Sequence, residues 1–425
     1  MLKFAFRNVL RNKRRSLISI SVLLVGMMGL GIFSGFMHFS FWGIQENIIH
    51  VGMGTPGGTG HFQIFDARYL KAEEPRFLDY GILGWQALIR EIESVPEVSF
   101  AAPRIDIMGL VSNGEKTEPI IGFAIDSSKE KHLPGIFGSA EPYVKLEMVN
   151  DGIILGKALA KTLNARESSY LTLLSTTTDG AMNAIDLQFA GTISTGSSEG
   201  DKRFILVNLR SAMNLVRSDR VRKIAVLLHE SNIRDRKGTS TELNFYNEAD
   251  MDKAAGVLGK ILDKGEYSMK SWRQLNSYYD SVKDIYNTIF GFIGFVMALV
   301  VILSIYNTMF MAVFERTKEI GTLMAVGTPR RYILLLFLLE GVIIALIGGA
   351  IGYGGTYIMA KIISNAGLIM PPPPGGTRGY PLVIHTVHWW WLSVVFFIML
   401  NTIVACFIPA YRAARMQIVK ALYHA

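Results

Sequence analysis

The chain has few charged residues and almost no cysteine. Charged residues make up 18% of its 425 residues, below the roughly 25% of a typical soluble domain. Its one cysteine, Cys406, lies in an apolar segment, which excludes an intramolecular disulfide and a multi-cysteine metal site. The net charge of +8 comes from basic residues beside apolar segments, with no groove-lining patch of basic and aromatic residues. We therefore expect no nucleic-acid partner.

Four stretches almost free of charge are long enough to cross a bilayer, which requires about 20 apolar residues. They cover residues 16–42, 285–314, 332–360 and 389–411, and the third contains Glu340. Glu340 is about two helical turns from Arg331, so we expect its side chain to snorkel to the interface; a proton-relay carboxylate is the alternative.

Basic residues flank these spans on one side. They are Lys3, Arg7, Arg11, Lys13, Arg14, Arg15, Arg316, Lys318, Arg330, Arg331, Arg412, Arg415 and Lys420. The positive-inside rule therefore makes both termini cytoplasmic and puts the large central region on the far side. The first apolar stretch is too long for a signal-peptide core, so we expect an uncleaved anchor.

The N-terminus, residues 2–15, has an amphipathic pattern. One helical face would carry the basic residues Lys3, Arg7, Arg11 and Arg14, and another the apolar residues Leu2, Phe6, Val9 and Leu10. This pattern predicts a helix lying on anionic lipid headgroups. A frayed basic tail is the alternative.

The short charged segment 314–331, between the second and third spans, also has helical periodicity. The pattern predicts one face made of Ile320, Leu323, Met324 and Gly327. Helix-neighbour spacing predicts ion pairs of Glu315 with Lys318 and of Arg316 with Glu319. Thr328 and Pro329 are expected to start the next helix as N-cap and first-turn proline. Either a cytoplasmic partner grips this helix or it is a polar loop that only sets topology.

Glycines one helical turn apart punctuate three spans, at Gly31 and Gly35, Gly291 and Gly294, and Gly348 and Gly352. They allow close helix packing, either within the chain or in a dimer.

The first two spans also continue past the bilayer: residues 43–49 are helix-compatible and residues 272–284 contain no helix breaker. We expect both to form a stalk beneath the external region.

The external region reads as an α+β domain. It has predicted strands at 60–65 and 221–228 and amphipathic helices at 85–92 and 251–262. The glycine-rich residues 52–60 lack the lysine and hydroxyl residue of a phosphate-binding loop, and residues 152–158 have the wrong spacing. Nucleotide binding is not expected here.

Histidines and tryptophans form no recognisable catalytic set. His61, His132 and His229 are far apart in sequence and read as ordinary core or surface residues. His385 and His388 have helical H-x-x-H spacing, but the further ligands of a metal site are missing. Trp389, Trp390 and Trp391 suggest an interfacial aromatic belt. The proline-rich loop at 370–376 is either a contact for the external domain or a partner, or a plain connector.

Several motifs resemble those of the FtsX-like permeases, which include the MacB and LolC/LolE types. The resemblance is carried by Glu315-Arg316, Glu319-Ile320-Gly321 and Ala325-Val326-Gly327, by residues 409–416, and by residues 152–160 and 191–196. Two positions depart from the family pattern: Ile418 stands where proline is usual, and residues 164–167 lack a glycine-acid turn.

This resemblance implies a four-span membrane protein with a large α+β periplasmic domain of porter and sabre lobes between the first two spans. Residues 1–48 would hold the amphipathic helix and first span, 49–270 the periplasmic domain, and 271–425 the remainder, with a coupling helix at about 314–328. The protein would work as a dimer with a second copy or paralogue in the bacterial cytoplasmic (inner) membrane. It would be no enzyme itself and bind no cofactor or metal, because a separate ATPase would supply ATP and Mg²⁺.

The resemblance also implies a mechanical role. Coupling residues would be Glu315, Arg316, Glu319, Ile320, Gly321, Ala325 and Gly327, with Glu315, Arg316 and Glu319 contacting the ATPase and Gly321 and Gly327 allowing close backbone approach. We expect release of lipoprotein or lipid, with an apolar cavity near Met37, Phe41, Phe292 and Phe295 and a periplasmic lipoprotein carrier or adaptor as further partner. Efflux of a peptide or drug through a tripartite assembly, and mechanotransmission to a periplasmic hydrolase or sensor without transport, are the alternatives.

Overall fold

A computed structural model describes residues 2–11, 13–52, 57–69, 79–134, 139–229, 248–262, 265–371, 377 and 379–422. The chain forms two compact units. The first, here called the helical unit, comprises Met1–Ser40, Val282–Leu368 and Pro381–Ala425; the second, the inserted domain, comprises Phe41–Ser281 and Ile369–Tyr380. Most of the predicted proline-rich loop, residues 372–376, lies outside the described residues.

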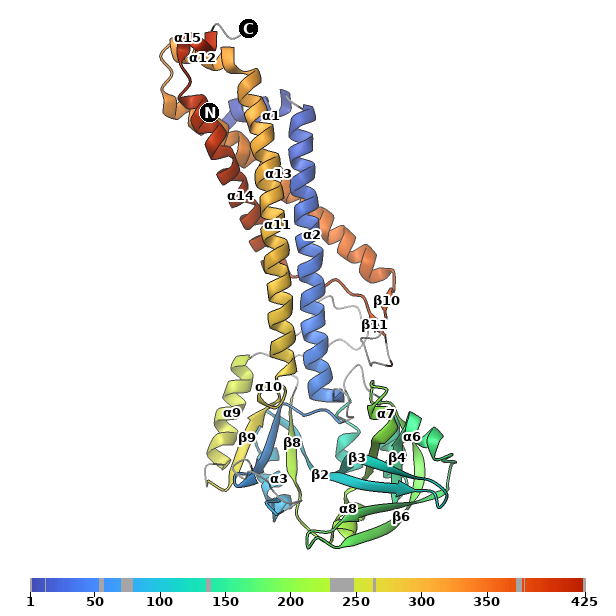
Figure 1. Ribbon diagram of the computed structural model, residues 1–425. Helices are drawn as coiled ribbons and strands as arrows, with labels where there is room; N and C mark the ends of the chain where they lie inside the picture. The colour runs from blue at the N-terminus through green and yellow to red at the C-terminus, as the bar shows by residue number, and fades with distance from the viewer. Residues whose placement is uncertain are drawn as a thin grey trace. The chain divides into compact units, whose positions relative to one another are not determined.

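Long apolar helices build the helical unit (Figure 1). Its elements are α1 (Leu2–Arg11), α2 (Lys13–Glu46), α11 (Tyr278–Glu315), α12 (Thr317–Ala325), α13 (Arg330–Asn365), α14 (His388–Ala414) and α15 (Ile418–Leu422). Among the described residues, four helices are long and apolar enough to cross a membrane, and they contain the four predicted spans. The predicted fold class, four long apolar helices with an α+β domain between the first and second, is confirmed.

The span glycines divide into two groups. A Cβ at Gly31 would meet Thr356 Cγ2 at 2.6 Å, one at Gly348 would meet Leu23 Cβ at 2.9 Å, and one at Gly352 would meet Met27 Cβ at 2.7 Å. These glycines therefore let α2 and α13 pack closely within one chain. By contrast, a Cβ at Gly291 or Gly294 on α11 would have nothing within 4 Å.

The inserted domain is α+β, as predicted. The strands of its main sheet are β1 (Phe62–Asp66), β2 (Val98–Ser112), β3 (Thr117–Ile125), β4 (Gly152–Gly156), β5 (Tyr170–Thr176), β6 (Met182–Ile193), β7 (Phe204–Asn208), β8 (Lys223–Leu228) and β9 (Tyr267–Ser271). Its helices are α3 (Trp85–Glu93), α4 (Ser127–Glu130), α5 (Glu141–Glu147), α6 (Lys157–Thr162), α7 (Gly200–Arg203), α8 (Leu209–Val216), α9 (Glu248–Leu262) and α10 (Trp272–Leu275). The strands and helices expected around 60–65, 85–92, 221–228 and 251–262 are all present.

The nine strands are joined in the order β3-β7-β4-β6-β5-β2-β8-β1-β9, and β3 also pairs with β2. This extra pairing closes six strands into a ring, from which β8, β1 and β9 extend. Pairs β3–β7 and β4–β6 are parallel, whereas the other pairs are antiparallel. Strand β4 is buried throughout, as expected of a continuous apolar run with neighbours on both sides. The long strand β2 therefore connects the ring to the extension.

Within the inserted domain, the end of α2 continues into a π-helical turn, η1 (Asn47–Val51). The amide of Gly60 donates to Ile49 O at 2.9 Å, and a Cβ at Gly58 would meet Ile49 O at 2.1 Å. A buried ion pair holds the same loop, because Arg104 bonds Glu130 and also donates to the carbonyl of Gly58 at 2.7 Å. Sequence spacing gave no sign of this pair, whose members are 26 positions apart.

The unbroken helix predicted over residues 272–284 is interrupted, although α11 does extend seven residues before Ile285. Residues 272–284 were expected to form one helix, but α10 ends at Leu275 and α11 begins at Tyr278. Asn276 has an extended backbone (φ −139°, ψ 92°), and its side chain accepts a hydrogen bond from the Tyr278 amide at 3.1 Å. A short polar side chain that caps the next helix thus breaks the first.

Candidate functional site

The candidate site is α12 with the residues that hold it. Its buried face consists of Thr317, Ile320, Gly321 and Met324. Leu323, predicted to share this face, is 37% exposed, and Gly327 is exposed too. Val326, just after the helix, is 83% exposed. The segment is therefore an ordered helix and not a loose polar loop, with apolar side chains on its outer side.

A Schellman motif ends α12. The amide of Thr328 donates to Leu323 O at 3.0 Å, and that of Gly327 to Met324 O at 3.1 Å. Gly327 has φ +96°, a conformation that strongly favours glycine, and open space surrounds its Cβ position. Its observed role is thus to turn the chain. The expected cap of α13 is shifted by one residue: Pro329 is the N-cap, and no side-chain hydrogen bond from Thr328 caps the helix.

The two ion pairs predicted within the segment are wrong. Glu319 instead accepts from Arg11 on α1 at 3.0 and 3.2 Å, and Glu315 pairs with Arg15 on α2. Arg316 donates to Glu340 on α13 at 2.9 Å. Tertiary partners have replaced the local ones because these three helices meet at the same end of the helical unit.

Glu340 does not snorkel to the interface, contrary to our prediction. It is 5% exposed, and its Oε1 accepts from Asn8 Nδ2 at 2.6 Å as well as from Arg316. Arg316 is itself only 7% exposed. A buried carboxylate is stable only when paired and hydrogen-bonded. The Asn8–Glu340–Arg316 triad therefore fixes α1, α12 and α13 to one another.

The predicted amphipathic helix at 2–15 is present in two pieces, α1 and the first residues of α2. Lys3, Arg7, Arg11 and Arg14 are all exposed, as the pattern requires. The helix packs on α13 through Ala5, Asn8 and Val9, so Val9 belongs to the buried face. Phe6 and Leu10 remain exposed, at 48% and 52%.

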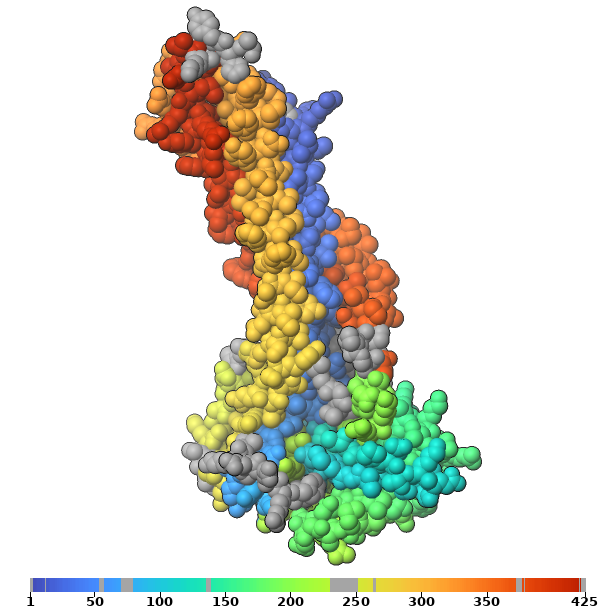
Figure 2. Space-filling view, viewed as in Figure 1, coloured from blue at the N-terminus to red at the C-terminus, as the bar shows by residue number. Residues whose placement is uncertain are grey.

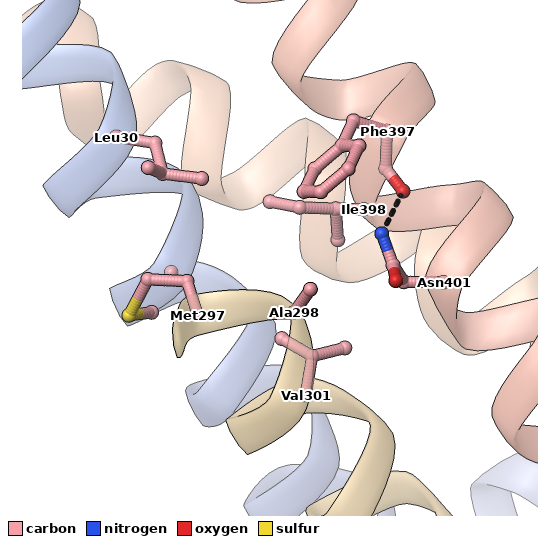
Figure 3. Close-up of a pocket in the computed structure, with 8 residues that line it drawn as sticks. Leu30, Met297, Ala298, Val301, Phe397, Ile398 and Asn401 are labelled. Atoms are coloured by element: carbon pink, nitrogen blue, oxygen red, sulfur yellow. Dashed lines mark hydrogen bonds between the residues drawn. The ribbon is translucent and has the colours of Figure 1, made fainter. Parts of the chain in front are cut away.

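The four residues predicted for an apolar cavity have different surroundings. Met37 is buried, Phe41 packs edge-on against Tyr279, and Phe292 and Phe295 are 68% and 61% exposed. A shallow apolar crevice lies elsewhere, between α2, α11 and α14 (Figure 3). Its lining includes Leu30, Met297, Val301, Phe397 and Asn401.

The surroundings of several histidines and tryptophans also differ from those predicted from the sequence. His385 precedes α14, so it shares no helical turn with His388; it stacks on His38 instead, with ring centroids 5.2 Å apart. Trp389 and Trp390 are exposed as an aromatic belt requires, but Trp391 is fully buried and donates to Gly31 O at 3.0 Å. Within the described residues, no three His, Cys, Asp or Glu side chains lie close enough to hold a metal.

His61 belongs to the core of the inserted domain, at 0% exposure. Burial and the neighbouring His50 lower the pKa of His61 to about 3. Its Nδ1 accepts a hydrogen bond from the Leu228 amide at 3.2 Å, which requires an unprotonated nitrogen.

The residue just past the proline-rich loop contacts the inserted domain, because the amide of Thr377 donates to Gly196 O at 3.0 Å.

Residues 291–418 match the family model described as FtsX-like permease C-terminal. This range begins in α11, includes α12 and α13, and ends at the first residue of α15.

Among curated proteins, the uncharacterised ABC transporter permease YknZ of Bacillus subtilis is 31% identical over 37% of this chain and 36% of its own length. The macrolide export ATP-binding/permease protein MacB of Escherichia coli is 26% identical over 47% of this chain and 31% of its own length. The lipoprotein-releasing system transmembrane protein LolC of Xylella fastidiosa is 23% identical over 80% of this chain and 81% of its own length. The match thus spans only about a third of YknZ and MacB.

Two solved structures are similar at low identity. The periplasmic region of MacB from Actinobacillus actinomycetemcomitans has a TM-score of 0.32 and 9% identity, covering 53% of this chain and 92% of that one. The extracellular domain of the YknZ transporter from Gram-positive bacteria has a TM-score of 0.31 and 11% identity, covering 49% and 99%. On the sequence matches, the chain carries an FtsX-like permease C-terminal domain at residues 291–418 and is related to the ABC transporter permeases MacB, LolC and YknZ.

Proposed function

We propose that the chain is the membrane subunit of an ABC transporter and that α12 is the surface on which a separate ATPase docks. The observation that carries this proposal is the way α12 is held. A buried ion pair fixes its start, a Schellman motif fixes its end, and yet Leu323 and Val326 remain exposed. A rigid helix with exposed apolar side chains is suited to seating in a groove of a partner protein.

The predicted coupling residues divide between contact and positioning. Glu315 and Glu319 lie at the exposed rim, whereas Ile320 and Gly321 are buried and hold the helix in place. Arg316 is buried and forms an ion pair with Glu340, so we assign it to positioning α12 and not to contact with the ATPase. Ala325 is exposed, and Gly327 makes the turn into α13. ATP and Mg²⁺ would be bound by the partner.

In this proposal the basic flanks make the α12 end cytoplasmic and the inserted domain periplasmic. Two ATPase subunits closing around ATP would push α12 on each of two membrane subunits, either two copies or a copy and a paralogue. Because α11 ends one residue before α12, this displacement would travel along α11. The ATPase would contribute the chemistry and this chain the movement.

The cargo we favour is a lipoprotein or lipid, because LolC, a protein of a lipoprotein-releasing system, matches over 80% of this chain. Phe292 and Phe295 on the open face of α11, with Met37 and Phe41 on α2, remain our candidates for contact with an acyl chain, and a periplasmic lipoprotein carrier would be the next partner. The similarity to MacB supports export through a tripartite assembly as the second candidate.

The test is binding of the ATPase. Leu323→Asp combined with Val326→Asp should weaken co-purification with a co-expressed ABC ATPase at least about tenfold, since both changes put charge on the proposed contact. The matched control is Leu368→Asp, a 50% exposed leucine just beyond the opposite end of α13. Unchanged ATPase binding by the double variant would refute the docking assignment. Reversing Arg316 is unsuitable, because it would bury two carboxylates together.

A further inference from the structure

Helix α1 presents two kinds of exposed side chain. Phe4, Phe6 and Leu10 are 53%, 48% and 52% exposed, and basic Lys3, Arg7 and Arg11 are exposed beside them. The helix has no acidic residue and is followed at once by α2, a helix apolar enough to span a membrane. Exposed aromatic and basic side chains on one short helix are the composition that binds a membrane surface with anionic lipids.

Basic residues of the same region also hold the end of α11 and the start of α12. Arg11 bonds Glu319 with both side chains more than half exposed, at 57% and 56%. Arg15, whose side chain is 21% exposed, pairs with Glu315, whose side chain is 53% exposed. Arg11 and Arg15 are therefore within reach of two kinds of anion, the carboxylates of this chain and the phosphates of a bilayer.

We infer that an anionic lipid surface binds α1 and competes with Glu315 and Glu319 for Arg15 and Arg11, so that membrane charge sets how tightly α12 is held. An exposed ion pair contributes little to stability, and the attraction of one basic side chain to an anionic leaflet is of similar size. Lipid can thus displace the Arg11–Glu319 and Arg15–Glu315 pairs. The buried Asn8–Glu340–Arg316 triad is shielded from headgroups, so α12 gains freedom without detaching.

This inference is independent of the proposed ATPase, and its test uses the full chain alone. Spin labels at Ile18→Cys on α2 and Thr322→Cys on α12 report the separation of the two helices, since both positions are exposed and Cys406 is fully buried. The protein is placed in nanodiscs of phosphatidylcholine, with or without about 30% phosphatidylglycerol. We expect the ratio of the short-distance to the long-distance population to fall about fivefold in the anionic discs.

Arg11→Gln combined with Arg15→Gln should show the long-distance population in both kinds of disc. The matched control, Arg330→Gln with Arg331→Gln, removes the same charge at the start of α13 and should respond to lipid as the parent chain does. A parent chain with identical distances in both discs would overturn the inference, as would a lipid response in the Arg11 and Arg15 variant. An equal response to soluble phosphate in neutral discs would also overturn it, because the partner would then not be a membrane surface.

Discussion

Helices α13 and α11 have nearly the same length and hydropathy but opposite surroundings. In the most apolar 18-residue stretch of α13, 56% of the residues are buried within the chain, whereas in that of α11 only 11% are buried. Figure 2 shows α11, in yellow and orange, lying on the surface along its length. Glycines on α13 contact α2 directly, and those on α11 face open space.

The difference teaches that hydropathy identifies a span but not what covers it. α13 carries the packing of the helical unit, and its glycines and Glu340 have partners from α1, α2 and α12. α11 has Phe292, Phe295 and Leu303 exposed at more than 60%, so lipid or a second copy must cover them in a membrane. Four predictions test this contrast between buried and exposed positions.

The largest effect is expected at the buried ion pair. Glu340→Leu leaves the guanidinium of Arg316 buried without its carboxylate, which should cost about 3–5 kcal/mol. Combining it with Arg316→Met should recover most of this loss, because a buried pair replaced by apolar side chains is often tolerated. Thermal unfolding in detergent measures both variants. If the single variant is as stable as the double one, the pair does not hold α12.

The second-largest effect is expected where α2 packs against α13. Gly352→Leu would force a side chain into Met27 and should destabilise the protein by about 1–3 kcal/mol. Gly291→Leu on α11 meets no atom within 4 Å and should change stability by less than about 0.5 kcal/mol. The same unfolding measurement compares them. Equal losses would mean that α11 is packed as tightly as α13.

The contrast extends to histidines of the inserted domain. The pKa of His61 is lowered to about 3 in the folded protein, whereas the unfolded chain takes up this proton near pH 6.5. Stability is therefore fully present above about pH 6.5 and should fall by about 1.4 kcal/mol per pH unit below it. Denaturant unfolding at several pH values should show a shallower slope for His61→Gln. His229→Gln, at an exposed position, should keep the parent slope.

The smallest effect concerns an exposed pair. Arg11→Gln removes the bond to Glu319 and should cost only about 0.2–1 kcal/mol, because both side chains are more than half exposed. High salt should weaken the parent chain more than the variant, because only the parent chain has the Arg11–Glu319 pair for salt to screen. A loss as large as that of Glu340→Leu would contradict the division between an outer pair and a buried triad.

Sequence predicted those features that depend on composition or local spacing. The four spans, the α+β insertion and the α12 helix followed from runs of apolar residues and their periodicity. The side-chain partners of Glu340 did not follow, since Asn8 and Glu340 are 332 positions apart. Local spacing offered Lys318 to Glu315, but the folded chain brought Arg15 closer.

Identical residues also behaved differently for reasons that sequence does not contain. Trp389 and Trp390 face outward while Trp391 turns toward α2, because successive residues of a helix point about 100° apart. The one signal that sequence reasoning underused was Glu340, a lone acid in a long apolar span. Such a residue is costly unless paired, so it calls for a partner from another helix.

The order of strands in the inserted domain has a consequence for biosynthesis. Strand β1 pairs with β8 and β9, which are the last strands of the nine-stranded sheet to leave the ribosome. During translation, β1 waits beside the first apolar helix with both backbone edges unsatisfied. The domain thus completes its sheet late and is exposed to mispairing until β9 arrives. A pause in translation after β9 has left the ribosome would give the nascent chain time to close the sheet.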